Sequence, residues 1–235
     1  MKSMKHPHPT GSTPVPQPPA APPIKPRPDV DLCRRGEERV ERILEAATTV
    51  FLEKGYRNAR LSDIVARAGG SLSTLYRAFG DKQGLAHAIM EQSIRAFGEG
   101  IAWLQQSTLP PEQALAAATD LLLDEMLTPQ RIVTHRIALC ECGEFPELLD
   151  WFLTHGVYTA ERSLSEYFTR EVAAGRLRMG SPELTAKHFF IMVFGAVIIH
   201  SATGRISPAD HERVRLETRE ALAIFLRGVL PDAPR

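Results

Sequence analysis

The hydrophobic positions between residues 55 and 85 predict two short helices joined by a glycine turn. In the first helix the apolar residues repeat at the spacing of one helix face, at Leu61, Ile64, Val65 and Ala68. Gly69–Gly70 ends this helix, because glycine reaches left-handed backbone conformations at low cost. Ser71 is a good N-cap for the second helix, in which Leu75 and Phe79 share the inward face. A second helix with a small polar outer face is typical of a helix-turn-helix.

Helices are also predicted on both sides of this motif. Apolar residues repeat at helical spacing from about residue 36 to 54, and glutamates fill the first turn, where negative charge suits the helix dipole. Gly55 ends this helix, which we expect to pack across the motif as a three-helix unit. A further helix, from about 82 to 106, begins after Asp81, a residue suited to the N-cap. Its expected buried positions are Ile89, Phe97, Ile101 and Leu104.

The remainder of the chain has almost no strand signal, and five more helices are predicted in it. Each begins at a proline, usually after Ser or Thr, and several end at glycine, which is the expected asymmetry of helix ends. Their predicted spans are 111–127, 129–143, 147–174, 182–203 and 208–230. The pattern therefore predicts an all-α protein of about nine helices, with a helix-turn-helix three-helix unit ahead of a C-terminal helical bundle.

The helix-turn-helix stretch resembles the DNA-binding domain of the TetR family of bacterial transcriptional repressors. The matching residues keep the family spacing without a gap: Gly55, Tyr56, Asp63, Ile64, Ala68, Gly69, Ser71, Thr74, Leu75, Tyr76, Phe79, Lys82 and Leu85. The chain has Ala59–Arg60 where the family has a threonine pair, and it also differs from the family at Gly70, Ser73 and Ala78. The loss of threonine at Arg60 removes the expected N-cap of the first motif helix.

The C-terminal half resembles the AcrR/AefR-like subgroup of the same family, in the phrases at residues 144–148, 175–177 and 181–184. Together the two resemblances imply a DNA-binding domain at residues 36–97 and an effector-binding and dimerisation domain at residues 98–235.

The N-terminal segment, residues 1–35, is predicted to be a disordered, proline-rich tail. Ten of the 18 prolines lie in the first 30 residues, which contain almost no large apolar side chain. Such a segment cannot bury enough surface to offset the entropy of ordering it. An alternative is that its basic residues form an arm that touches DNA phosphates or the minor groove.

Candidate DNA contacts follow from the position of the recognition helix, whose N-terminal residues face base edges in the major groove. These candidates are Leu72, Ser73 and Thr74, then Tyr76 and Arg77 one turn later, together with Lys82, Arg57 and Arg60. The family resemblance implies that Thr74, Tyr76 and Lys82 contact phosphates. Arg77 can grip guanine with two hydrogen bonds, but a phosphate contact or a solvated charge is the alternative.

Two surfaces are expected in the C-terminal half. The last two helices carry an apolar load that suits a four-helix dimer interface, with candidates Phe194, Val197, Ile198, Leu222 and Phe225. Large rings spread over four helices suggest a ligand pocket, with candidates Trp103, His135, Phe152, Tyr158 and Phe190. For both sets, packing within a single chain is the alternative.

Composition and charge narrow the remaining possibilities. Formal net charge is zero, but electrostatic DNA binding needs only a local basic face. The three cysteines, Cys33, Cys140 and Cys142, form no disulfide framework, so we expect a cytoplasmic protein. Whether Cys140 and Cys142 form a thiol sensor or are inert stays open. The run Phe189–Ile199 is about half the roughly 20 residues that a membrane span requires, so no membrane partner is expected.

Catalytic signatures are not evident in the sequence. It contains neither a GxSxG motif nor a P-loop, and its histidines lack the spacing of metal ligands. We therefore expect no enzyme activity, no metal and no cofactor.

The sequence predicts a ligand-responsive transcriptional regulator. We expect a homodimeric repressor that a small-molecule effector releases from double-stranded operator DNA. The alternative is a helical, small-molecule-binding or enzyme-like dimer with a degenerate DNA-binding motif, favoured by the departures at Ala59–Arg60, Gly70 and Ser73.

Overall fold

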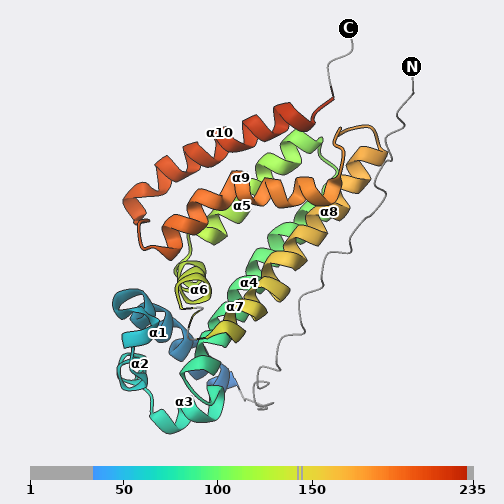
Figure 1. Cartoon of the computed structure of the whole chain (residues 1–235). Coiled ribbons are helices and arrows are strands. Elements are labelled where there is room, and N and C mark those ends of the chain that lie inside the picture. The colour runs from blue at the N-terminus through green and yellow to red at the C-terminus, as the bar shows by residue number, and fades with distance from the viewer. Residues whose placement is uncertain (1–33, 142, 144, 232–235) are drawn as a thin grey trace, which may run out of the picture.

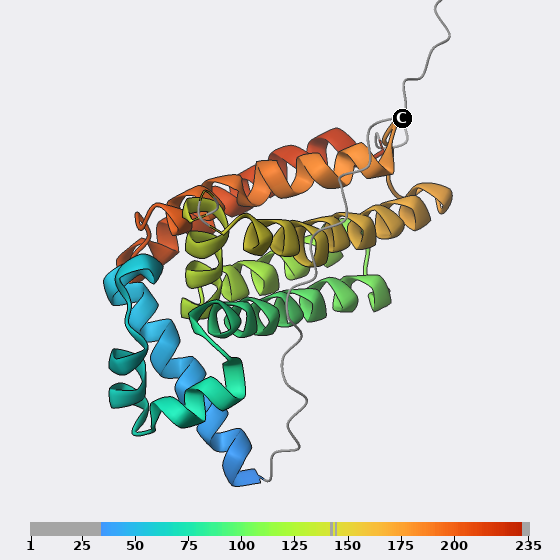
Figure 2. The same cartoon turned by 60° about the horizontal axis from the view of Figure 1, so that its bottom comes forward.

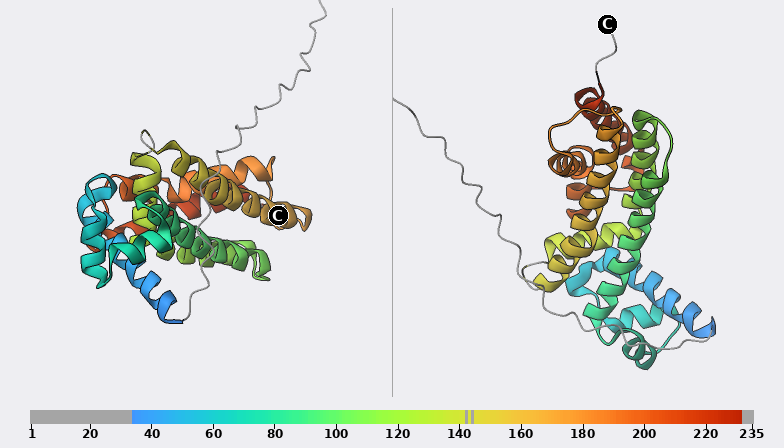
Figure 3. Two further views of the ribbon diagram at one scale, coloured as in Figure 1. Left: turned by 90° about the horizontal axis from the view of Figure 1, so that it is seen from below. Right: turned by 90° about the vertical axis from the view of Figure 1, so that its right-hand side faces the viewer.

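A computed structural model describes residues 34–141, 143 and 145–231, and every regular element within them is a helix. The first three helices form a unit at one end of an elongated bundle made by the later helices (Figure 1; Figure 3). The predicted all-α fold is therefore confirmed. Most of the predicted tail, residues 1–33, lies outside the described residues, so its disorder stays a prediction.

The three-helix unit consists of α1 (Arg34–Asn58), α2 (Leu61–Ala68) and α3 (Leu72–Phe79). Gly55 interrupts α1 where the sequence predicted its end, with φ of 75°, and one further turn leads to α2. Gly69 has φ of 65°, the left-handed conformation that the turn between α2 and α3 requires. The unit buries side chains from all three helices, among them Ile43, Phe51, Ile64 and Leu75.

The bundle is built from the remaining helices, and the sequence placed most of their ends correctly. They are α4 (Lys82–Gln106), α5 (Pro111–Met126), α6 (Pro129–Cys140), α7 (Pro146–Phe152), η1 (Leu153–Val157), α8 (Tyr158–Ala173), α9 (Pro182–Ala202), η2 (Pro208–Asp210) and α10 (His211–Val229). The predicted helix 147–174 is one continuous run in which the π-helical turn η1 separates α7 from α8. Counted in this way, the described part of the chain has the nine helical runs that the sequence predicted.

Side-chain caps fix several of these starts. The Ser71 hydroxyl accepts a hydrogen bond from the backbone N–H of Thr74 at 3.3 Å, and the Asp81 carboxylate accepts one from Gly84 at 2.8 Å. Thr128 and Ser181 cap α6 and α9 in the same way. Arg60 precedes α2 without a side-chain capping bond, as expected from the missing threonine.

Two hydrophobic cores stabilise the molecule, and the first is not confined to the three-helix unit. It includes the start of α4, Val133 and Ile137 from α6, and Leu148 and Phe152 from α7. The second core lies between α4, α5, α8, α9 and α10. Figure 2 shows how the three-helix unit packs against the near ends of the bundle helices. The unit is therefore held by shared burial as well as by the chain connection through α4.

In the described part of the chain, α9 is one helix with the length and apolar composition of a membrane span. It packs against α6, α8 and α10, and it buries Phe189, Phe194 and Val197 in the second core. Core helices of soluble proteins share these properties, so the composition alone is weak evidence for a span.

Candidate nucleic-acid interface and ligand cavity

The outer face of α3 is exposed at the lower end of the three-helix unit, remote from α9 and α10 (Figure 1). Leu72, Ser73, Tyr76 and Arg77 all lie on it, and Tyr76 is 51% exposed. The opposite face of the helix packs into the first core through Leu75, Ala78 and Phe79. A short helix anchored on one side and polar on the other is suited to enter a DNA groove.

Thr74 is turned partly away from this face. Its hydroxyl lies 3.1 Å from the hydroxyl of Ser71, the residue that caps α3. The pair fixes the first turn of α3.

Charged pairs hold α2 onto α1. Arg67 donates two hydrogen bonds to the Glu53 carboxylate at 2.8 and 2.9 Å, and Lys54 donates one to Asp63 at 2.8 Å. The bond from Arg67 lowers the pKa of Glu53, and the bond from Lys54 lowers the pKa of Asp63. Arg60, at the start of α2, is exposed.

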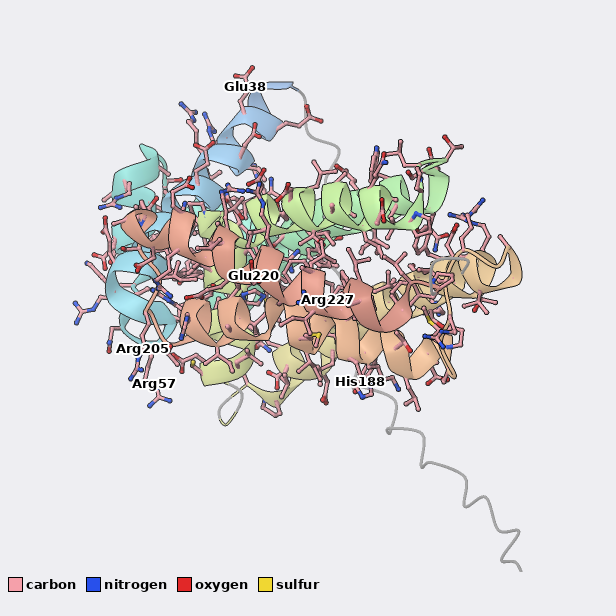
Figure 4. The ribbon with its side chains drawn as sticks, turned by 90° about the horizontal axis from the view of Figure 1, so that it is seen from above. Glu38, Arg57, His188, Arg205, Glu220 and Arg227 are labelled. Carbon is pink, nitrogen blue, oxygen red and sulfur yellow. The ribbon has the colours of Figure 1, made fainter. Side chains whose placement is uncertain are left out.

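Two of the expected DNA contacts, Lys82 and Arg57, also have partners within the chain. The Lys82 ammonium donates to the backbone carbonyls of Arg57 and Ala59 at 3.0 and 3.1 Å, and it lies 4.7 Å from the ring centroid of Tyr56. The Arg57 guanidinium lies 3.5 Å from the carboxylate of Glu141, at the end of α6. Figure 4 shows Arg57 at the edge of the three-helix unit. Both cations thus tie the turn after α1 to the bundle, a role that sequence spacing does not reveal.

A cavity of about 390 Å³ lies between α4, α6, the η1–α8 segment and α9. Its walls are mainly apolar and include Ile94, Phe97, Ile101, Met126, Phe190 and Ile198. The π-helical turn η1 contributes His155 and Gly156, and an added Cβ at Gly156 would lie 3.2 Å from Ile94. Such turns are frequent at functional sites.

Three of the five expected pocket residues line this cavity, namely His135, Phe152 and Phe190. Trp103 is not among the lining residues, and its side chain is 37% exposed. Tyr158 lies on an outer groove of α8 and α9 and is also exposed. These two assignments are corrected: ring size suggested them, but neither side chain reaches the cavity.

The cavity wall also contains a buried arginine that sequence reasoning missed. Arg131 is 3% exposed, its Nη2 donates to the Ser93 carbonyl at 2.6 Å, and its guanidinium lies 4.7 Å from the ring centroid of Phe97. The Glu125 carboxylate is 4.0 Å away. Burial lowers the pKa of Arg131 to about 10, and Glu125 partly opposes this shift. The only sequence signal was its position four residues before His135 on one helix.

His135 lies beside this arginine. It is 2% exposed, and its ring makes an edge contact with Phe152 at a centroid distance of 6.1 Å. Burial, together with the charge of Arg131, lowers the pKa of His135 to about 3, so the ring is neutral near pH 7. Its Nδ1 and the Nε of Arg131 have no hydrogen-bond partner among the described residues.

The expected dimer-interface residues are mostly intrachain core. Phe194, Val197, Leu222 and Phe225 are buried in the second core, and Ile198 is half-buried at the cavity. The exposed apolar side chains of these helices are instead Ile191, Met192 and Ile199 on α9, and Leu216 and Ile224 on α10. Figure 4 shows His188 on α9 and Glu220 and Arg227 on α10.

The structure describes one of the three cysteines, so the question of a thiol sensor stays open. Cys140 is exposed, and its Sγ donates to the Ala202 carbonyl at 3.3 Å, whereas Cys33 and Cys142 lie outside the described residues. The described residues contain no group of three or more metal-ligating side chains.

Two sequence models of one family match the chain. The model described as "Bacterial regulatory proteins, tetR family" matches residues 43–89, and "AefR-like transcriptional repressor, C-terminal domain" matches residues 113–228. The HTH-type transcriptional regulator YvkB of Bacillus subtilis is 26% identical over 194 residues, which is 82% of this chain and 97% of YvkB.

Solved structures show the same fold. A TetR-family transcriptional regulator from Mesorhizobium loti superposes with a TM-score of 0.70 at 20% identity, covering 85% of this chain and 100% of that one. The flavonoid-responsive regulator FrrA superposes with a TM-score of 0.53 at 25% identity, covering 84% and 100% of the two chains.

Proposed function

Because the chain belongs to the TetR family of bacterial transcriptional regulators, we propose that it is a homodimeric repressor that a small molecule releases from its operator DNA. DNA binding and transcription regulation are properties of the matched family. The repressor role is supported by the description of the family model that matches the C-terminal half. The proposal includes a cytoplasmic location and no enzyme activity, cofactor or membrane partner.

The exposed face of α3 is the observation that carries the proposal. Ser73 and Arg77 face outward with Leu72 and Tyr76, on a helix that the Ser71 cap and the first core hold in place. Leu72 and Ser73 are the candidates for base contacts. The candidates for phosphate contacts are Thr74, Tyr76, Lys82, Arg57 and Arg60. Arg77 has the fork geometry to read a guanine.

A homodimer is supported by the exposed apolar face of α9 and α10. Ile191 and Ile199 are 71% and 60% exposed, and Leu216 is 64% exposed. Leu184, Ile191, Met192 and Ile199 recur at helical spacing along one side of α9, and a contiguous apolar stripe of this kind marks an interaction surface. The same stripe on a second subunit would cover it in an isologous four-helix interface. Two α3 helices about 34–36 Å apart would then reach successive major grooves.

Release by a small molecule is supported by the position of the cavity. Its walls come from α4, which continues from the α3 turn, and from α6, whose residues also join the first core. A ligand that binds the DNA-incompetent arrangement better than the competent one shifts the population away from the operator. FrrA, which is described as flavonoid-responsive, provides a related example of such a response.

The test of this function is DNA binding by the purified protein. Fluorescence anisotropy with the DNA upstream of its own gene, and with fragments selected from a random pool, gives the affinity at two salt concentrations. With six to ten phosphate contacts, affinity falls about 10³–10⁵-fold between roughly 50 and 200 mM salt. Arg77→Ala is expected to reduce discrimination by about 1–3 kcal/mol if Arg77 reads a base.

The matched control is Arg162→Ala, which removes an exposed arginine on α8 far from α3. It is expected to bind DNA like the wild type. If no sequence is enriched from the random pool, the motif is degenerate, and the helical small-molecule-binding alternative replaces the regulator.

A further inference from the structure

The cavity wall is mainly apolar, and α6 contributes two of its polar residues. Arg131 and His135 lie four positions apart, so both face the same side of the helix. Of the other polar wall residues, Gln105 already donates its amide to the Ser163 carbonyl, and His155 is exposed. The two α6 residues are therefore the most deeply buried polar groups in contact with the cavity.

Arg131 is a buried cation whose protein partners neutralise it only in part. Its one close acceptor is a neutral carbonyl, that of Ser93. The Glu125 carboxylate stands at 4.0 Å, and burial raises the pKa of that carboxyl group, which weakens it as a counterion. A guanidinium offers five N–H donors in a fixed fork, and buried charges are stable when paired with an opposite charge. The Nε–H group has no hydrogen-bond partner among the described residues.

His135 adds a second hydrogen-bonding group at the same end of the cavity. As a neutral ring it has one nitrogen that donates and one that accepts. Its Nδ1 has no partner among the described residues. A ligand oxygen placed between the two residues would meet a cation on one side and a neutral imidazole on the other.

The remaining wall sets the size and character of the molecule. A cavity of about 150 Å³ lined by aliphatic and aromatic side chains holds benzene, and this cavity measures about 390 Å³. Phe97, Phe152 and Phe190 form its aromatic surface. An occupant with more than one ring, or an equivalent branched hydrocarbon body, fits this space.

We propose that the cavity selects apolar molecules that carry one acidic oxygen group, a carboxylate or a phenolate, and that Arg131 and His135 receive this group. The inference rests on the proposed ligand-binding function and specifies the chemistry of its ligand. The ligand anion would compete with the Ser93 carbonyl of α4 for the Arg131 guanidinium of α6. Ligand binding would therefore change the contact between α4 and α6, the two helices that connect the cavity to α1–α3.

The experiment compares two ligands of the same shape. Calorimetry measures binding of 2-naphthoate and 2-naphthamide to the full-length protein without DNA, since the two probes differ in charge at one group. The wild type is expected to bind the carboxylate at least about tenfold more tightly, equivalent to about 1.4 kcal/mol. Arg131→Met is expected to bring the ratio close to one, because methionine keeps the stem volume and removes the charge. Arg162→Met, on the outside of α8, is expected to preserve it.

The ratio of naphthoate to naphthamide affinity in the wild type tests the inference even if Arg131→Met folds poorly. In that case Arg131→Lys replaces Arg131→Met, and its affinity ratio is expected to lie between those of the wild type and one. Equal or tighter binding of the amide, or no binding of either probe up to 1 mM, would overturn the inference and leave Arg131 as a structural cation. Because no DNA is present, failure here leaves operator binding untouched. Conversely, selective binding of naphthoate by a protein that binds no DNA would support this inference and contradict the proposed regulator function.

Discussion

At the scale of single residues, long charged side chains have partners that the sequence pattern did not indicate. Lys82 and Arg57 are expected phosphate contacts, and both also bind acceptors within the chain. Arg131 attracted no notice in the sequence because arginine is almost never fully buried without a partner. In each case a long flexible side chain reaches groups on another element, which local spacing does not encode.

Lys82→Met is expected to lower the free energy of unfolding by about 1–2 kcal/mol, because it removes two charge-assisted hydrogen bonds to backbone carbonyls. Chemical denaturation of the full chain measures the change. Lys187→Met is the control, since its ion pair with Glu183 is exposed and separated by one helical turn, which makes a change below about 0.5 kcal/mol the expectation. If the Lys82→Met protein is as stable as the wild type but fails to bind DNA, Lys82 acts as a phosphate contact and contributes little to stability.

At the scale of elements, α6 occupies the position through which the cavity and the three-helix unit communicate. One side of it carries Arg131 and His135 at the cavity. From the next position, Arg136 donates to the Leu52 carbonyl of α1 at 3.2 Å and to the Ser201 carbonyl of α9 at 3.3 Å. A displacement of α6 by a ligand would therefore be transmitted to the backbone of α1.

Arg136→Met is expected to leave the affinity for 2-naphthoate nearly unchanged and to reduce its effect on DNA affinity. Couplings of this kind are worth about 1–3 kcal/mol, or roughly 5- to 150-fold in affinity, and linkage makes them reciprocal. Anisotropy measures the change in DNA affinity that naphthoate causes, and calorimetry measures the change in naphthoate affinity that DNA causes. Linkage requires the two changes to be equal. A variant whose coupling equals that of the wild type would show that α4 alone carries the signal.

The elements also show how far sequence reasoning reached. Helix ends were predictable because proline, glycine and capping side chains act locally, as at Ser71 and Gly69. The buried and exposed faces of α2 and α3 were predictable, because their apolar positions recur at helical spacing. Those of α9 were not predictable, because this helix is apolar on nearly every side from Phe189 to Phe194, so periodicity did not distinguish its core face from its exposed face.

At the scale of the whole molecule, the open question is the assembly. The described surface leaves a strip of aliphatic side chains on α9 and α10 in contact with solvent. A second subunit would bury this strip, and it would also set the distance between the two α3 helices.

Ile199→Glu is expected to give a folded monomer, because it places an unpaired charge in the proposed interface at a cost of several kcal/mol. Phe194→Glu is expected to unfold the chain instead, since Phe194 is buried in the intrachain core. Light scattering after size exclusion and circular dichroism distinguish these outcomes. Leu121→Glu, at an exposed position on α5, is the control and should remain dimeric. A monomeric wild type at micromolar concentration would contradict the dimer.

The first hydrophobic core also bears on how this protein can be rebuilt. A chimera that joins this three-helix unit to the bundle of another regulator needs a junction, and α4 is the helix that links the two parts. The core of the three-helix unit also includes Val133, Ile137, Leu148 and Phe152. A junction within α4 would therefore pair half of this core with unrelated residues from the other protein. A functional chimera would have to include the core-facing residues of α6 and α7 together with α1–α3. For protein design, α6 and α7 therefore belong to the DNA-binding unit.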